Sequence, residues 1–359
     1  MTSRPPEKIA FLFPGQGSQG VGMGRELANM YPVAQRTFEE ADAALGFKLS
    51  QLCFEGPEEK LRLTEITQPA ILTMSVAAFR VLREKGIVPV IAAGHSLGEY
   101  SAHVAAGTLE FADAVRTVHH RGRYMQEAVP VGKGAMAAVL GMPIDELQAL
   151  CFHVVDDVRA AHELKKSGSQ NELDDLLLTI GSGETRHRFT FADGVGVCCQ
   201  PANINSPDQI VISGSKAAVE RAAELAKHRG AKRAIMLPVS APFHSALMQP
   251  AQDRLATDLK ALKFLSMSVP VVTNVDAEVV SDPEKARDAL IRQVTGAVQW
   301  ERSMRALIRR GISTFIEVGP GKVLCGLMRQ VDRSKTCLNV EDEASLQKVV
   351  NHFAGAEVK

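Results

Sequence analysis

Long apolar runs are missing from the 359-residue sequence, and none approaches the length needed to span a membrane. The first eight residues also lack the apolar core of a secretory signal peptide. The six cysteines are scattered without the spacing of a metal site or of a disulfide framework. We therefore expect a cytoplasmic protein with reduced thiols, no bound metal and no membrane partner.

Excess charge of either sign is also missing, because 41 Lys and Arg residues balance 41 Asp and Glu residues. Overall charge therefore gives no reason to expect nucleic acid as a partner. The contents of hydrophobic residues, 45%, and charged residues, 23%, are ordinary for a folded protein and exclude extensive disorder. A chain of this length can bury one large core plus a subdomain, or form two ordinary domains.

A nucleophile-elbow pattern, G-x-S-x-G, spans residues 94–98 and centres on Ser96. The short apolar segment 88–93 before it predicts a buried strand, and the segment 99–106 after it predicts a helix that ends at Gly107. This strand–turn–helix order would present the Ser96 hydroxyl at a helix N-terminus, where free N–H groups favour a developing oxyanion. The alternative is an ordinary surface turn.

A glycine-rich loop, residues 14–20, directly follows a short apolar strand predicted at residues 9–13. Its spacing matches neither a dinucleotide-binding loop nor a P-loop, which carries a lysine. A plain strand-to-helix turn is possible. We favour a loop whose backbone N–H groups face the Ser96 elbow.

Alternating helices and strands on both sides of the chain's centre predict a mainly parallel, hydrolase-like α/β sheet with flanking helices. One of the expected helices, 68–85, has Pro69 in its first turn and Gly86 just past its end. The other expected helices are 24–45, 112–127, 286–295 and 300–310, and further strands are expected at 269–274 and 314–318.

The central part of the chain predicts a different, smaller domain. Its elements follow the ferredoxin-like β-α-β-β-α-β order, at 135–140, 143–151, 195–200, 209–214, 216–229 and 234–239. We expect this domain to span 131–242 and to interrupt a large α/β domain made of 1–130 and 243–359. The polar segment 156–194 is predicted to be a surface insertion within the small domain.

A serine nucleophile needs a base, which can be far away in sequence. Among the ten histidines, His244 stands where the small domain returns to the large one, two residues after Pro242. Domain junctions are common places for binding sites. His95, next to the serine, is expected to be turned away from the site, so His244 is the predicted base.

Seven motifs in fixed order make the chain resemble the malonyl-CoA:acyl-carrier-protein transacylases of bacterial type II fatty acid synthesis. The resemblance runs from about Ile9 to about Val331 and is interrupted by the segment 156–194. The motifs are residues 13–19, 94–100, 121–126, 203–207, 243–245, 298–300 and 317–321. They imply transfer of a malonyl group through a serine ester with ping-pong kinetics.

The resemblance assigns five catalytic positions. Ser96 corresponds to the acylated nucleophile and His244 to the general base. The main-chain carbonyl of Gln299 corresponds to the group that orients the histidine. The backbone N–H groups of Gln16 and Leu97 correspond to the oxyanion hole. The expected arrangement is a Ser–His dyad oriented by a carbonyl, without an aspartate.

Substrate recognition is expected from a second set of residues. Arg121 corresponds to the arginine that binds the malonyl carboxylate, a role that suits its planar fork; without the resemblance it would be interpreted as a solvated helix residue. Bulky residues at Leu97 and Phe243 accompany malonyl preference in related acyltransferases. The other expected pocket residues are Met125, Asn203 and Asn205, although the two asparagines could instead cap loop backbone.

Malonyl-CoA and a phosphopantetheine-bearing acyl carrier protein are the implied substrates, with no bound cofactor and a monomeric enzyme. The pair Lys232 and Arg233 could contact the acidic carrier protein or the CoA phosphates, or be ordinary surface residues. Three alternatives stay open. They are a trans-acting malonyltransferase of polyketide synthesis, a serine esterase or thioesterase, and a carrier-binding scaffold without catalysis.

Overall fold

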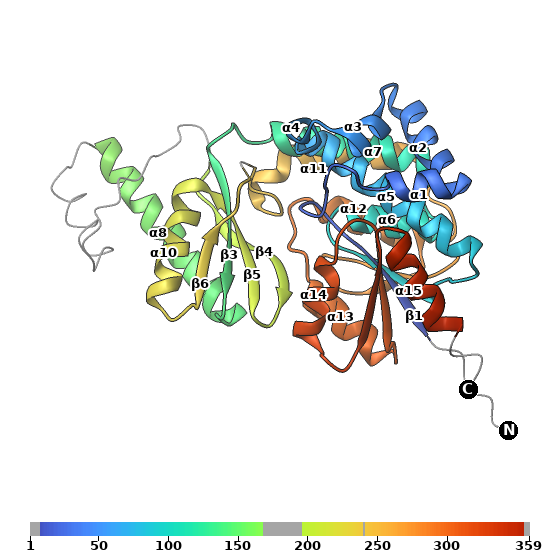
Figure 1. The fold of residues 1–359 in the computed structure, drawn as a ribbon. Coiled ribbons are helices and arrows are strands. Elements are labelled where there is room, and N and C mark those ends of the chain that lie inside the picture. Colours follow the sequence, from blue (N-terminus) through green and yellow to red (C-terminus); the bar gives the residue numbers. More distant parts are fainter. Residues whose placement is uncertain (1–7, 168–195, 240, 355–359) are drawn as a thin grey trace. The chain divides into compact units, whose positions relative to one another are not determined.

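The computed structural model describes residues 8–167, 196–239 and 241–354, and it divides the chain into two compact units (Figure 1). The first unit comprises Met1–Tyr124, Gln252–Gln293 and Val298–Lys359, and the second comprises Met125–Ala251 and Val294–Ala297. The sequence-based boundaries at 130/131 and 242/243 both fall inside the second unit, which also takes the short segment Val294–Ala297.

A six-stranded sheet forms the centre of the first unit, in the order β10-β9-β1-β2-β7-β8 (Figure 1). All neighbouring strands are parallel except the final pair, β7 and β8, so the predicted mainly parallel sheet is confirmed. The strands are β1 (Ile9–Phe13), β2 (Ile91–Gly94), β7 (Val271–Val272), β8 (Val279–Val280), β9 (Thr314–Val318) and β10 (Thr336–Val340).

Helices cover both faces of this sheet, which explains why the central strand β1 is buried along its whole length. On one face, Ala10 and Leu12 pack in a cluster with Trp300 of α13. On the other face, the Phe11 ring meets the Phe79 ring of α5 at 6.3 Å. The unit's helices are α1 (Arg25–Met30), α2 (Pro32–Leu45), α3 (Leu49–Glu55), α4 (Glu58–Leu61), α5 (Thr64–Glu84), α6 (Gly98–Ala105), α12 (Pro283–Arg292), α13 (Trp300–Arg309), α14 (Val323–Val331) and α15 (Glu343–Ala354).

Helix α5 begins at Thr64, so the prediction that Pro69 occupies its first turn is wrong. Pro69 lies inside the helix, where its missing N–H leaves the Glu65 carbonyl without the usual helical donor. The ring of His119 compensates, because its Nδ1 lies 2.8 Å from that carbonyl oxygen. The proline is therefore accommodated by a neighbouring helix.

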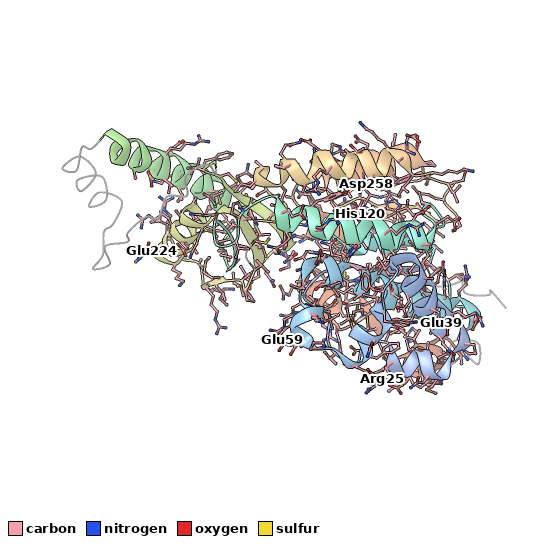
Figure 2. All side chains as sticks on the ribbon, turned by 90° about the horizontal axis from the view of Figure 1, so that it is seen from above. Arg25, Glu39, Glu59, His120, Glu224 and Asp258 are labelled. Atoms are coloured by element: carbon pink, nitrogen blue, oxygen red, sulfur yellow. The ribbon has the colours of Figure 1, made fainter. Side chains whose placement is uncertain are left out.

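Helix α7 (Phe111–Glu127), which carries His119, also meets α11 (Gln249–Ala261). Figure 2 shows His120 of α7 and Asp258 of α11 on these neighbouring helices, and the His120 Nδ1 lies 2.9 Å from a carboxylate oxygen of Asp258. The hydroxyl of Tyr124, one turn further along α7, donates to the same carboxylate oxygen at 3.1 Å. These two bonds attach α7 to α11 through the single side chain of Asp258.

The second unit has the predicted ferredoxin-like order. Its antiparallel sheet runs β4-β5-β3-β6, and α8 and α10 pack on one face around a single apolar cluster. The elements are β3 (Gly134–Leu140), α8 (Ile144–Ser167), β4 (Cys199–Ser206), β5 (Gln209–Ser215), α10 (Lys216–His228), β6 (Arg233–Met236) and the short 3₁₀ turn η1 (Ala246–Met248).

Two boundaries predicted for this unit are wrong. Helix α8 continues to Ser167 instead of ending at Cys151, so the polar segment expected to begin at Asp156 starts inside a regular helix. The apolar side chains of Val154 and Val158 extend the helix's buried stripe past that point, which explains the continuation. The remainder of that segment, 168–194, lies outside the described residues. Strand β4 begins at Cys199, later than expected, and includes Asn203 and Asn205.

Candidate active site

Ser96 sits in the turn between β2 and α6, as the elbow pattern predicts. Its φ is 52°, a left-handed conformation that L-residues rarely adopt. Such strain persists only where the surroundings hold it, and it is concentrated at functional sites. The strand–turn–helix prediction is confirmed, and an ordinary surface turn would not require this conformation.

The glycines of the elbow are required by close backbone approach. A Cβ on Gly94 would collide with the backbone of Gly98. A Cβ on Gly98 would collide with the carbonyl oxygen of Phe13, at the end of β1. The pattern thus allows the elbow to pack directly against the neighbouring strand.

The loop after β1 lies next to the elbow, as favoured from the sequence. The His95 N–H donates to the Phe13 carbonyl at 2.9 Å, and a Cβ on Gly15 would lie 2.5 Å from the His95 carbonyl oxygen. Gln16 follows in this loop and is exposed, whereas Leu97 is buried at the start of α6. The His95 ring packs 5.4 Å from that of Trp300, consistent with a structural role.

Arg121 is buried, so its interpretation as a solvated helix residue is wrong. Its Nη1 donates to the Gln68 side-chain oxygen at 2.8 Å, and its Nη2 donates to Gln293 Oε1 at 3.0 Å. The same Nη2 lies 3.1 Å from the hydroxyl oxygen of Ser96. Burial lowers the pKa of Arg121, and the nearby Tyr100 and Glu99 oppose that shift.

No carboxylate lies within ion-pair distance of this guanidinium in the part of the chain that the structure describes. The buried Nε of Arg121 has no hydrogen-bond partner there either. A buried cation without an anionic partner is costly. Arg121 therefore has an unused capacity to bind an anion next to the Ser96 hydroxyl.

Two amide residues that the motif analysis missed hold the backbone of Ser96. Asn274 Oδ1 accepts the Ser96 N–H at 2.6 Å, and Gln293 Nε2 donates to the Ser96 carbonyl at 2.9 Å. Asn274 ends the segment predicted as a strand at 269–274, and a polar residue at the carboxyl end of a parallel strand is a signal that could have identified it. Gln293, beyond α12, offers no comparable signal.

His244 belongs to the second unit, whereas Ser96 and Arg121 belong to the first. Its φ is 57°, the same left-handed region that Ser96 occupies, and its side chain is buried. Its Nδ1 lies 3.2 Å from the carbonyl oxygen of Gly296. If Nδ1 carries the proton, this contact leaves Nε2 as the basic nitrogen.

The orienting carbonyl is predicted to come from Gln299, and within the second unit the carbonyl oxygen of Gly296 also lies 3.2 Å from His244 Nδ1. Gln299 precedes α13, and its carbonyl oxygen accepts the N–H and the hydroxyl of Ser303, each at 2.9 Å. This oxygen therefore serves the first turn of the helix. Gly296, three residues earlier, belongs to the segment Val294–Ala297 of the same unit as His244.

Gln200 of β4 is a further residue that the sequence did not reveal. Its Nε2 lies 3.3 Å from the His244 carbonyl oxygen and 3.4 Å from that of Thr295, and its Oε1 accepts the Ala246 N–H at 3.1 Å. One side chain thus joins the His244 turn to the segment that carries Gly296. It supports the strained backbone of the predicted base.

The remaining predicted pocket residues all lie in the second unit. Phe243 packs on the sheet face opposite α8 and α10, in a cluster that includes Val211. Asn203 pairs directly with Val211 across the sheet, so it shares this face. Asn205 is buried in an irregular part of the same strand, and Met125 is buried near the end of α7.

The basic pair lies at strand β6. Lys232 donates to Asp208 at 2.9 Å, and both side chains are largely exposed. Arg233 is exposed and has no ion pair among the described residues. Arg233 is therefore the more available of the two charges.

No helix in the described ranges is long and apolar enough to cross a membrane. Within the same residues there is no group of three or more His, Cys, Asp or Glu side chains that could hold a metal ion.

Comparison with known proteins identifies the family to which the chain belongs. The acyl transferase domain family matches residues 10–189 and 183–352, and the chain belongs to that family. The malonyl CoA-acyl carrier protein transacylase of Bacillus subtilis is 46% identical over 343 residues, 96% of each chain. The one from Salmonella typhimurium is 44% identical over 340 residues, covering 94% of this chain and 97% of the relative. The chain is thus, more narrowly, a member of the malonyl CoA-acyl carrier protein transacylases, and an acyltransferase.

Solved structures agree with this assignment. The transacylase of Coxiella burnetii superposes with a TM-score of 0.84 at 40% identity, covering 96% of this chain and 98% of that one. A malonyl-transacylase solved in complex with the acyl-carrier protein of a type II polyketide synthase gives 0.83 at 40% identity, covering 96% and 100%. These neighbours confirm the predicted α/β fold with its smaller second domain.

Proposed function

We propose that the chain transfers the malonyl group of malonyl-CoA to the phosphopantetheine thiol of an acyl carrier protein and so supplies fatty acid synthesis. The observation that carries the proposal is the distance of 3.1 Å between the Ser96 hydroxyl and Nη2 of the buried, anion-free Arg121. A carboxylate bound there would hold a malonyl thioester beside the nucleophile. The names of the relatives match this chemistry.

The first half of the reaction forms a malonyl ester on Ser96. His244 Nε2 takes the Ser96 proton as the oxygen attacks the thioester carbonyl, and the C–S bond then breaks. The leaving CoA thiolate receives that proton from His244. The Gly296 carbonyl would hold Nδ1–H and stabilise the imidazolium, in the role that an aspartate has in other sites.

The oxyanion is stabilised by the backbone N–H groups of Gln16 and Leu97. Neither group donates to an acceptor elsewhere in the described chain, so both are available. In the second half, the carrier thiol gives its proton to His244 and attacks the ester carbonyl, and Ser96 regains its proton on leaving. Malonyl-CoA and the carrier are substrates in this scheme, and the absence of a bound cofactor stays a prediction, as does the cytoplasmic location.

Intact-protein mass spectrometry tests the proposal directly. Incubation with malonyl-CoA should add the mass of one malonyl group, and a chase with carrier protein should remove it. Ser96→Ala should abolish the added mass. His244→Ala should slow its formation by roughly two to four orders of magnitude. A malonyl adduct that persists on the Ser96→Ala protein would contradict the assignment.

A carrier of polyketide synthesis is a second candidate acceptor, because a similar structure was solved with such a carrier. A chase with each type of carrier separates the two. An esterase is a weaker alternative, and an acyl-enzyme that survives in water while a thiol discharges it would exclude that alternative.

A further inference from the structure

Glu99 is a buried carboxyl beside the nucleophile that the proposed mechanism does not use. It lies in the first turn of α6, three residues after Ser96, and its side chain is fully buried. Buried carboxyl groups are costly unless hydrogen bonds hold them. Its Oε2 accepts the Asn274 N–H at 3.0 Å and Gln293 Nε2 at 2.7 Å.

Both partners of Glu99 are the residues that hold the strained backbone of Ser96. Asn274 uses its N–H on Glu99 and its Oδ1 on the Ser96 N–H. Gln293 uses its Nε2 on both the Glu99 carboxyl and the Ser96 carbonyl. The serine is thus held on its N–H side and on its carbonyl side by two residues that share one carboxyl oxygen.

The chemistry of a carboxylate sets the orientation of the Gln293 amide. Glu99 Oε2 accepts the bond that joins it to Gln293, so Gln293 must turn its NH₂ group toward Glu99. Its Oε1 then faces Arg121 and accepts from Nη2 at 3.0 Å. A reversed amide would set NH₂ against a guanidinium, donor against donor.

We propose that Glu99 is a positioning residue of the site: through Asn274 and Gln293 it fixes the Ser96 backbone and the orientation of the Arg121 guanidinium. The proposal rests on the proposed function, in which Ser96 is acylated and Arg121 binds the malonyl carboxylate. Losing Glu99 frees the Gln293 amide to reverse, and Arg121 loses a fixed acceptor. Acyl groups that carry a carboxylate should then suffer more than those that do not.

Substrate preference is the readout that separates positioning from general damage. The experiment measures kcat/KM for malonyl-CoA and acetyl-CoA in the wild type, Glu99→Ala and Glu99→Gln. The malonyl-to-acetyl ratio should fall at least about tenfold in Glu99→Ala, because coupled neighbours commonly interact on this scale. Glu99→Gln should restore the ratio to within about threefold, since its amide oxygen can accept both bonds.

A double variant and a matched control complete the test. The malonyl-to-acetyl ratio of Glu99→Ala combined with Gln293→Ala should fall no further than that of Gln293→Ala alone, because the effect of Glu99 on Arg121 acts through the Gln293 amide. Glu317 supplies the control, since it is another buried carboxyl group of this unit and accepts the N–H groups of Leu324 and Cys325. Glu317→Gln should lower stability and leave the substrate ratio unchanged.

A folded Glu99→Ala protein with an unchanged ratio overturns the proposal, and so does a Glu99→Gln protein as impaired as Glu99→Ala. If Glu99→Ala fails to fold, Glu99→Asp replaces it with the same two outcomes, because its shorter side chain cannot reach both partners. A wild-type protein that takes no malonyl group contradicts the proposed function itself, a failure distinct from either of these.

Discussion

At the scale of single residues, Arg121 is expected to decide which acyl group is accepted. Its Nη2 contacts the Ser96 hydroxyl and Gln293, and its Nη1 contacts Gln68, so the guanidinium is fixed by neutral oxygens only. Neutral partners hold its plane without cancelling its charge. An arriving carboxylate would therefore meet an oriented cation that has no direct ion-pair partner among the described residues.

Replacing Arg121 with alanine should lower malonyl kcat/KM by two to three orders of magnitude, while acetyl kcat/KM changes far less. Removing one member of a buried charged pair costs roughly 3–5 kcal/mol, and acetyl has no carboxylate to lose. Arg121→Lys should recover only part of the preference, because an ammonium lacks the planar fork. The measurement is the malonyl-to-acetyl ratio in all three proteins. An equal fall for both substrates would make Arg121 a structural residue.

Glu99 should also make stability depend on pH. Burial raises its pKa from 4.5 to about 7, although the bonds from Gln293 and Asn274 and the charge of Arg121 oppose the shift. Since the folded-state pKa is the higher one, the folded protein holds a proton that the unfolded chain loses between pH 4.5 and 7. The contribution of protonated Glu99 to the free energy of unfolding is fully present below pH 4.5 and is lost as the pH rises through 7.

Glu99→Gln removes this titration, so the variant should gain stability relative to the wild type as the pH rises. The expected gain between pH 5 and pH 8 is roughly 2 to 3 kcal/mol, measured by chemical denaturation at both values. His103 Nε2 lies 4.0 Å from Glu99 Oε1, and burial lowers the pKa of His103 to about 3, so the folded protein keeps this histidine neutral between pH 5 and pH 8. Glu59→Gln, at an exposed position labelled in Figure 2, is the control and should show no such trend. If the stability difference between Glu99→Gln and the wild type did not change with pH, Glu99 would be ionised throughout this range.

At the scale of elements, the elbow depends on the contact between α6 and the end of β1. Gly98→Ala places a Cβ against the backbone of Phe13, which cannot move aside as a side chain can. We expect destabilisation of at least about 1–3 kcal/mol, together with slower malonyl loading because the loop carrying Gln16 is displaced. Gly326→Ala in α14, where nothing lies within 4 Å of the added Cβ, should instead be neutral or slightly stabilising. Thermal unfolding and loading rates of both variants check this, and a wild-type melting temperature for Gly98→Ala would contradict it.

Elements were predictable where the signal was local. The elbow, β9 and the ferredoxin-like order follow from apolar runs, glycines and helix periodicity, all of which lie within short stretches of sequence. The start of α5 was misplaced because Pro69 is normally a first-turn residue, and its tolerance inside the helix depends on His119 from another helix. The Gly296 carbonyl beside His244 Nδ1 could not be predicted, because no motif relates residue 296 to residue 244.

At the scale of the whole molecule, the family could be identified from ordered motifs, but the supporting side chains could not. Gln200, Asn274 and Gln293 come from distant parts of the chain and act by holding backbone, so no spacing rule relates them to Ser96 or His244. Their amide groups are chemically ordinary, and only three-dimensional structure shows what they bond.

Arg233 is the charge on which the carrier interaction is predicted to depend most. It is exposed and unpaired within the described residues, whereas Lys232 is already bonded to Asp208 at 2.9 Å. Arg233→Glu should therefore raise the KM for the carrier protein several-fold and weaken its dependence on salt, because rim charges act mainly on association. Lys232→Glu should have a smaller effect, since the charge it removes is already partly offset.

Malonyl transfer to free pantetheine isolates the carrier from the chemistry. That rate should be unchanged in both variants, because a small thiol needs no charged docking surface. Lys216→Glu is the matched control, since this exposed lysine of the same unit lies at the start of α10 and should leave the carrier KM unaltered. Equal carrier kinetics in the Arg233→Glu and Lys216→Glu proteins at low salt would place the carrier on a different surface. A loss of pantetheine transfer in Arg233→Glu would instead assign β6 a structural role.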